Sequence, residues 1–194
     1  MVSQTQTDRV VEGVELPPVG TWRFDPAHTT IGFVARHLLS KVRGRFNEFD
    51  GTIVIADRPE DSKAVVEIAT SSVETKTDMR DDHLRSPDFF DSERYPTMTF
   101  RSTELRPTGG NRFQLVGDLT IKDVTNPVTL DAELHGFGPG LDPNGPLVAF
   151  FSARAEVDRE DWDLTWNVAV ETGGVLVGRM VQIEIETELL LQPS

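Results

Sequence analysis

Hydrophobic and polar residues alternate with a period of two along most of the chain beyond residue 20. The first long alternating run places Ile31, Phe33 and Ala35 on one face, and residues 181–189 alternate apolar with mostly acidic positions. Such alternation is typical of antiparallel strands that have one buried and one solvated face. The predicted strands cover residues 29–37, 51–55, 63–68, 97–101, 113–121, 128–136, 147–157 and 181–189.

Turn-forming residues separate these strands. Asn126-Pro127 and Gly138-Pro139-Gly140 both interrupt the alternation with residues that favour turns. About eight strands at this spacing predict an all-β sandwich or barrel, and closure into a barrel would leave no exposed sheet edge. Gly117 lies inside one alternating run, where we expect a bulge or a point of close packing.

Residues 78–90 depart from the strand pattern and predict a short helix. Thr77 or Asp78 is expected to cap its first turn. The helix should end near Ser86 because Pro87 follows, and the residue before a proline is disfavoured in helical conformation.

The first 20 residues are polar at first and then reach two consecutive prolines. This composition predicts a flexible or loosely docked lead-in over residues 1–20, with one barrel domain over residues 21–194. The opening residues show no basic stretch followed by an apolar run, so no signal peptide is expected. No later segment has the apolar length of a membrane span. We therefore expect a cytoplasmic protein without stable membrane insertion.

The chain carries 32 Asp and Glu against 19 Lys and Arg, a formal net charge of -13. A surface this acidic repels phosphate backbones, so no nucleic-acid partner is expected, and the lack of a polybasic cluster argues against docking on anionic membranes. The plainest interpretation of the charge is solubility. The sequence has no cysteine, which excludes disulfides, thiolate metal sites and cysteine nucleophiles.

Motifs for catalysis or metal binding are missing. The chain has no Gly-x-Ser-x-Gly elbow, no His-Glu-x-x-His and no phosphate-binding loop. The histidines are dispersed along the sequence, and His28 and His37 are better interpreted as a strand-end cap and a residue at a barrel rim than as metal ligands. The acids of residues 156–163 indicate a solvated face. We therefore expect no catalytic residue, no metal site and no cofactor.

The apolar interior is rich in phenylalanine, with 11 Phe against 3 Trp and 1 Tyr. A barrel of about eight strands can either fill with side chains or leave room for one slender ligand. The pattern alone leaves both outcomes open. Small residues that would leave room are Ala35, Gly44, Ala69, Ala149, Ala153 and Ala155.

Several motifs occur together and in order. The opening one reads WRFDPAHTTIGF over residues 22–33, and a later one reads RDDHLRSPDFFD over residues 80–91. With the further motifs at residues 36–38, 42–46, 72–75, 95–100 and 117–122, the chain resembles the YceI-like family of lipocalin-like barrels over about residues 21–191. The resemblance implies an all-β fold with one or two short helices. It also implies an eight-stranded antiparallel barrel, with a helix at its opening and an elongated apolar pore.

The same resemblance implies a bound lipid in place of a cofactor. The ligand would be a long-chain amphiphile of the polyisoprenoid, isoprenoid-quinone or fatty-amide type, held for carriage or storage without catalysis. A homodimer is expected from the resemblance alone. Many members are exported to the periplasm, and this chain departs from them in its polar lead-in. Asp123 and Asp163 stand where the family usually has glycine.

Pattern and resemblance together predict the site residues. The expected pore lining is Phe33, Ala35, Phe46, Val66, Ile68, Phe100, Leu119, Phe151 and Ala153, with Trp162 and Trp166 reshaping one end. Leu84, Phe89 and Phe90 are expected to close the mouth. The candidates for a polar or phosphate head group are His37, Arg45, His83 and Arg85. Helix solubility and salt bridges to Asp81, Asp82 or Asp88 are the alternative interpretation of these four residues.

Two other functions stay open. The first is an enzyme acting on an isoprenoid or quinone lipid with His37 or His83 as the acid–base group, although no second catalytic partner is visible. The second is a ligand-free, stress-related interaction protein whose barrel is filled with side chains. Added ligand would not stabilise such a protein.

Overall fold

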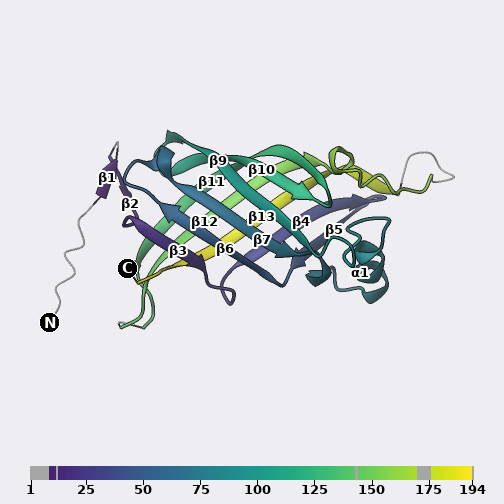
Figure 1. The fold of residues 1–194 in the computed structure, drawn as a ribbon, viewed down its shortest axis with the longest axis horizontal. Helices are drawn as coiled ribbons and strands as arrows, with labels where there is room; N and C mark the ends of the chain where they lie inside the picture. Colours follow the sequence, from purple (N-terminus) through teal and green to yellow (C-terminus); the bar gives the residue numbers. More distant parts are fainter. Residues whose placement is uncertain (1–8, 12, 143, 170–175, 194) are drawn as a thin grey trace.

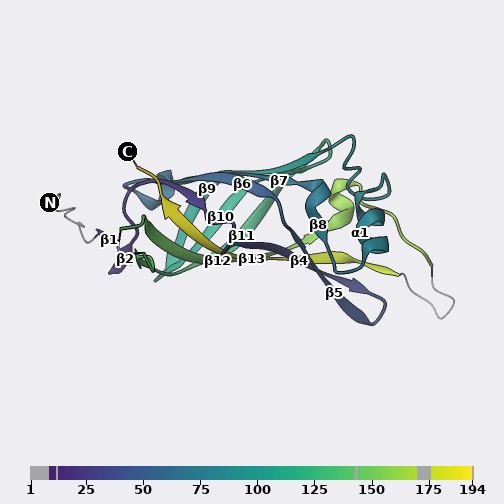
Figure 2. The same cartoon turned by 90° about the horizontal axis from the view of Figure 1, so that it is seen from below.

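In the computed structural model the chain forms a closed antiparallel β-barrel with one α-helix at one end (Figures 1 and 2). The structure describes residues 9–11, 13–142, 144–169 and 176–193. Backbone hydrogen bonds join the strands into one ring, which closes because β12 pairs with β13. The long strands are consecutive neighbours in this ring: β9 (Thr97–Gly109), β10 (Arg112–Ile121), β11 (Val124–Pro139), β12 (Leu147–Asp158) and β13 (Val177–Leu191).

Shorter strands complete the ring and form bent segments of the wall. β3 (Gly20–Phe24) pairs with the end of β13, and β4 (Thr30–His37) pairs with the earlier part of the same strand. β5 (Ser40–Phe46) and β6 (Phe49–Ile55) follow each other almost directly. The remaining wall strands are β7 (Lys63–Ala69), between β6 and β9, and β8 (Val73–Glu74), beside β5.

The eight-stranded antiparallel barrel that the sequence predicts is confirmed. All the strands expected from alternation are present, and most are longer than expected. The sequence analysis did not assign β3, β5 and β8: β3 and β8 are short, and in β5 a glycine, Gly44, takes the place of one inward apolar side chain. Short 3₁₀ turns occur at η1 (Pro59–Asp61), η2 (Thr70–Ser72) and η3 (Arg159–Trp162).

The pattern of β13 shows how the sequence builds the wall. Val181, Ile183 and Ile185 line the interior, whereas Gln182 and Glu186 are exposed on the outside. Successive side chains of a strand point to opposite faces, so this strand separates an apolar lumen from water by a single layer of backbone.

Two glycines let aromatic rings lie flat along the wall. A Cβ atom at Gly44 would come within 2.2 Å of the Phe33 ring on the neighbouring strand. A Cβ atom at Gly117 would lie 2.5 Å from the Phe100 ring, and the β9–β10 register shifts at this residue. The expectation of a bulge or close packing at Gly117 is confirmed. Both rings therefore occupy space that a larger residue would fill, which leaves more of the lumen open.

The helix α1 (Asp78–Arg85) begins after Thr77 and ends before Ser86, where the sequence predicts its bounds, but the Thr77 side chain makes no capping hydrogen bond. A buried carboxylate fixes it to the barrel: Asp81, which is 5% exposed, accepts hydrogen bonds from the backbone N–H of Thr75 (2.8 Å) and from the Thr75 hydroxyl. In the described residues no helix is long and apolar enough to cross a membrane.

A hairpin lies at the opposite end of the barrel from α1 (Figure 1). It consists of β1 (Arg9–Val11) and β2 (Val14–Leu16), and Leu16 is buried against Phe113 and Leu134. These residues belong to the expected flexible or loosely docked lead-in, and here they form paired and packed structure. Residues 1–8 lie outside the described residues, and the domain boundary near residue 20 stays a prediction.

We expect Asp81→Ala to lower the free energy of unfolding by about 1–3 kcal/mol, because it removes the acceptor of two buried hydrogen bonds. Urea denaturation monitored by circular dichroism would measure this. Asp82→Ala is the matched control on the same helix: its side chain is 77% exposed and pairs with Arg85 at the surface. We expect the control to change stability by less than about 0.5 kcal/mol. Equal losses in both variants would contradict the role assigned to Asp81.

Candidate ligand-binding cavity

An elongated cavity of about 740 Å³ runs through the barrel from the β1–β2 end to the α1 end. This volume lies in the range of roughly 300–1,000 Å³ that is usual for ligand pockets. Its wall is formed by the inward side chains of the strands, nearly all of them apolar. Several of these, such as Phe33, Val66 and Ile183, are only half-buried although they face inward. The side chains therefore do not fill the interior.

A packed cluster lies at the β3 end of the cavity. Trp22 and Ala149 are fully buried, Leu189 is 3% exposed, and all three belong to one apolar cluster. The indole N–H of Trp22 donates to the carbonyl of Pro18 (3.2 Å). Arg9 also lines this end and donates to the carbonyl of Ala56 (2.6 Å). The cluster closes the apolar wall here with the one polar atom of Trp22 satisfied.

An aromatic cluster lies at the α1 end. The His83 ring stands edge-on to Trp166, with centroids 4.4 Å apart, and edge-on to Phe89 at 5.1 Å. Phe90 reaches the ring of Phe46 at 5.6 Å. These rings and Leu84 all line the cavity. The lining at this end is thus built from α1 and the residues just after it, packed on the chain that follows η3, and their role in closing the mouth stays a prediction.

The structure places most of the predicted site residues in the cavity wall, and their contact with a ligand stays a prediction. The residues predicted for the site that line the cavity are Phe33, Ala35, His37, Phe46, Val66, Ile68, His83, Leu84, Phe89, Phe90, Phe100, Leu119, Phe151, Ala153, Trp162 and Trp166.

Two of the predicted head-group residues, Arg45 and Arg85, are not among the residues that line the cavity, and the structure gives both of them other partners. Arg45 lies on the outer face and pairs with Glu74 at 2.8 Å. It neighbours the inward Phe46 on the same strand, so it must point outward. Arg85 instead fastens α1 by donating to the carbonyls of Ser71 (2.8 Å) and Val73 (3.0 Å).

Sequence reasoning missed Arg159, a buried cation in the cavity wall. Arg159 is 5% exposed and lies in the segment that the sequence assigned to a solvated acidic face. Burial lowers the pKa of its guanidinium from the ordinary value. The only signal in the sequence is the Arg-x-x-aromatic pattern that begins at this residue. The same search missed Arg80, Thr75 and Thr77, which line the cavity near α1.

The residues after Arg159 explain one departure from the family pattern. Asp163 has a left-handed backbone conformation, with φ 57° and ψ 23°, at the position where the resemblance expects glycine. Aspartate is among the residues that tolerate this conformation best after glycine. The turn at Asp163 therefore forms without glycine. It leaves Trp162 2% exposed, with its indole N–H donating to the carbonyl of Leu119 (2.9 Å).

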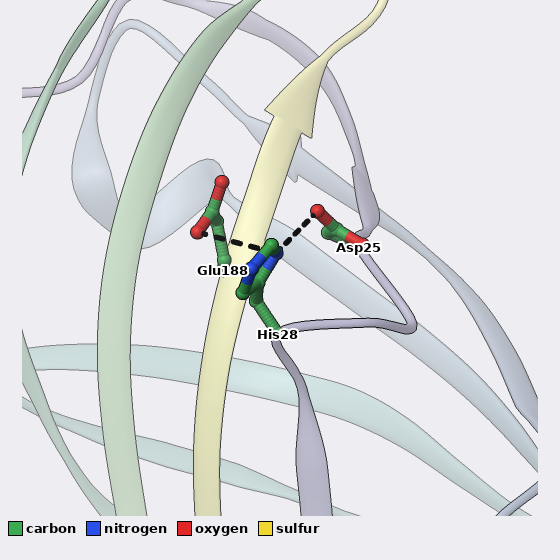
Figure 3. A group of neighbouring side chains, drawn as sticks. All are labelled: Asp25, His28 and Glu188. Atoms are coloured by element: carbon green, nitrogen blue, oxygen red, sulfur yellow. Dashed lines mark hydrogen bonds and ion pairs between the residues drawn. The ribbon is translucent and has the colours of Figure 1, made fainter. Parts of the chain in front are cut away.

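A cluster of Asp25, His28 and Glu188 lies on the outer face of the barrel (Figure 3). The Nδ1 atom of His28 is 2.8 Å from a carboxylate oxygen of Asp25 and 3.9 Å from one of Glu188. Within the described part of the chain it is the one group of three His, Asp or Glu residues whose potential metal-ligand atoms lie within 4.8 Å of one another. The His28 side chain is 64% exposed. Ion pairing accounts for the contacts, which join the β3–β4 corner to β13.

The family follows from comparison with known proteins. Residues 22–189 match the model of the YceI-like domain, so the chain belongs to this family. A UPF0312 protein of Staphylococcus aureus is 38% identical over 168 residues, covering 85% of this chain and 94% of that protein. A UPF0312 protein of Staphylococcus epidermidis is 39% identical over 170 residues, covering 86% of this chain and 95% of the relative.

Solved structures share the barrel. The Campylobacter jejuni YCEI protein is 28% identical and superimposes with a TM-score of 0.69, covering 81% of this chain and 90% of its own. BcnA of Burkholderia cenocepacia, at 23% identity, has a TM-score of 0.71 with 85% and 98% covered. A polyisoprenoid binding domain from Saccharophagus degradans, at 14% identity, has a TM-score of 0.63 with 90% and 100% covered.

We expect the His28 cluster to stabilise the fold within a limited pH window. The hydrogen bond to Asp25 raises the pKa of His28, and the same bond lowers the pKa of Asp25. The contribution of His28 is present below its ordinary pKa and is lost as pH rises through the raised value. That of Asp25 is present above its ordinary pKa and is lost as pH falls through the lowered value. His28→Asn should therefore destabilise the protein most at about pH 5–6 and little at about pH 9.

Urea denaturation of wild type and His28→Asn across this pH range would measure the difference. His135→Asn serves as the control, because the His135 ring contacts the hydroxyl of Ser152 (2.7 Å) instead of a carboxylate. A destabilisation by His28→Asn that stays constant with pH would exclude the ion-pair role.

Proposed function

We propose that this protein binds one long-chain amphiphilic lipid inside the barrel, for carriage or storage and without catalysis. The lipid would be of the polyisoprenoid, isoprenoid-quinone or fatty-amide type. The observation that carries the proposal is the unfilled, elongated apolar cavity of about 740 Å³. A continuous apolar tunnel fits a long chain, and it offers few polar groups to a compact polar ligand.

The energetics of chain burial support this proposal. Each methylene group moved from water to an apolar environment contributes about 0.8 kcal/mol. A chain that extends along the cavity would therefore bind tightly with few directional contacts. The name of the Saccharophagus degradans domain states that it binds polyisoprenoid, and a Campylobacter jejuni YCEI mutant was crystallised with a monobromobimane guest. The name of the Saccharophagus degradans domain supports a lipid ligand for this kind of barrel.

An enzyme acting on such a lipid is a weaker candidate. The ring of His83 contacts Asp88 (2.9 Å) at the cavity mouth, an arrangement that can orient a general base. In the described residues, however, neither His83 nor His37 has a ring hydrogen bond to a hydroxyl group that could serve as the nucleophile. A binding role needs none of these groups. A cytoplasmic location and a homodimer stay predictions.

We expect Ala153→Trp to block the cavity. Ala153 faces the lumen from β12, so a Trp side chain there would occupy the path of the lipid chain. Binding of geranylgeraniol, measured by native mass spectrometry and by displacement of an apolar fluorescent probe, should weaken at least about tenfold, or ~1.4 kcal/mol.

Arg154→Trp is the matched control, because Arg154 is the next residue on β12 and is exposed outside. It should bind geranylgeraniol like the wild type, and both variants should keep the circular dichroism of the folded barrel. Unchanged binding by a folded Ala153→Trp variant would rule out the lumen as the site. A wild-type protein that binds no long-chain lipid would support the ligand-free interaction protein instead.

A further inference from the structure

The cavity wall and the rest of the molecule have opposite charge. The chain has 32 Asp and Glu against 19 Lys and Arg. In the part of the chain that the structure describes, however, the cavity lining contains no Asp or Glu. Its ionisable residues other than histidine are Arg9, Arg36, Lys63, Arg80 and Arg159. Because acids outnumber bases in the chain, a random distribution would place more acids than bases in the lining. The lining shows the opposite.

Arg159 is the most deeply buried of these cations. Its Nε atom donates to the carbonyl of Gly178 (3.0 Å), and its two terminal nitrogens donate to the carbonyls of Leu164 and Val177. A guanidinium has five N–H donors, so these bonds leave donors over. Within the described residues it has no carboxylate within ion-pair distance. The buried guanidinium is therefore held directly by backbone carbonyls, and the neighbouring carboxylates of Asp158 and Glu160 act on its charge only at longer range.

The acids on either side of Arg159 are engaged elsewhere. Asp158 and Glu160 both pair with Arg179, the latter at 3.1 Å, and Arg179 is 60% exposed. A charge buried without a counter-charge costs free energy, and proteins usually pair it. A ligand is the remaining source of an anion on the lumen side.

A second cation lies at the same end of the cavity. Figures 1 and 2 place the turn of η3, which begins with Arg159, and α1, which carries Arg80 and His83, at the same end of the barrel. Arg80 donates to the Thr75 side-chain oxygen (2.6 Å) and the Thr75 carbonyl (2.8 Å), and it has no carboxylate partner in the described residues. Two arginines without ion pairs therefore line the mouth, where the head group of a lipid with its chain in the lumen would lie.

We propose that the lipid carries an anionic head group, a carboxylate or a phosphate, and that Arg159 and Arg80 hold it at the α1 end of the cavity. This inference rests on the proposed function and narrows its ligand class. Arginine suits the role because its planar donors match the oxygens of a carboxylate or a phosphate. A neutral alcohol or amide could accept one hydrogen bond there but would leave the buried charge of Arg159 unpaired.

The test compares ligands that share one isoprenoid chain and differ in the head group. Geranylgeraniol is neutral, geranylgeranoic acid carries a carboxylate, and geranylgeranyl phosphate carries a phosphate. At neutral pH the wild type should bind one or both anions roughly ten- to hundredfold more tightly than the alcohol. Whichever anion binds more tightly identifies the head group. Arg159→Met should remove most of this preference, because the two anions should lose more affinity than the alcohol does.

Further variants keep the test decisive if Arg159→Met does not fold. Arg80→Met should reduce the preference in part, and Arg159→Lys should retain part of it. Arg112→Met, a change at an arginine that is 70% exposed on the β9–β10 hairpin, should leave it unchanged. Equal affinity of the wild type for the alcohol and both anions would overturn the anionic head group while the carrier function stands. Binding of an isoprenoid quinone or a fatty amide but of none of these three ligands would likewise overturn the anionic head group. If quinones and fatty amides also fail to bind, the proposed function itself fails.

Discussion

The pairing of β12 with β13 is the interaction on which the rest of the structure depends. It closes a ring of backbone hydrogen bonds that runs through β3, β6, β7 and β9 to β13, so the inward faces of these strands meet around one lumen. An eight-stranded barrel has an interior just wide enough to be filled by side chains or to hold one slender ligand. Here the side chains do not fill the interior, and a cavity of about 740 Å³ remains. Glycines at positions 44 and 117 give the rings of Phe33 and Phe100 a place along the wall, and alternate positions of the strands carry moderate-sized apolar residues.

The outer and inner faces of the barrel wall carry different kinds of residue. Acids exceed bases in the chain by 13, and on the outside clusters such as Asp25, His28 and Glu188 connect neighbouring strands. On the inside, the lining is apolar and its few charges are positive, with Arg159 the most deeply buried of them. The helix α1 lies at one end of the cavity, and the buried carboxylate of Asp81 holds this helix in place by accepting a hydrogen bond from the Thr75 backbone N–H. The chain of a long amphiphile would match the apolar lining, and a compact acidic head would match the positive charges within it.

Much of the barrel could be predicted from the sequence, because a strand with one wet face records its orientation at every second residue. The alternation of β13 and the inward faces of β4 and β10 follow from it, and the bounds of α1 follow from Thr77 and Ser86. The same rule, applied strictly, would have placed Arg45 outside, since Phe46 faces inward. Arg159 could not be placed this way, because a 3₁₀ turn has no strand period and its neighbours are acidic. The β1–β2 hairpin depends on packing of Leu16 against distant residues, which no local pattern reveals.

The central claim is that the barrel binds a long-chain amphiphile, and it is tested most directly by identifying the molecules that co-purify with the protein. Native mass spectrometry of the intact protein should show one small molecule bound to each barrel. Denaturing extraction into organic solvent, followed by mass spectrometry of the extract, should identify it as a long-chain amphiphile. A barrel that carries nothing, and takes up nothing after incubation with isoprenoid alcohols, acids, phosphates, quinones and fatty amides, would contradict the account.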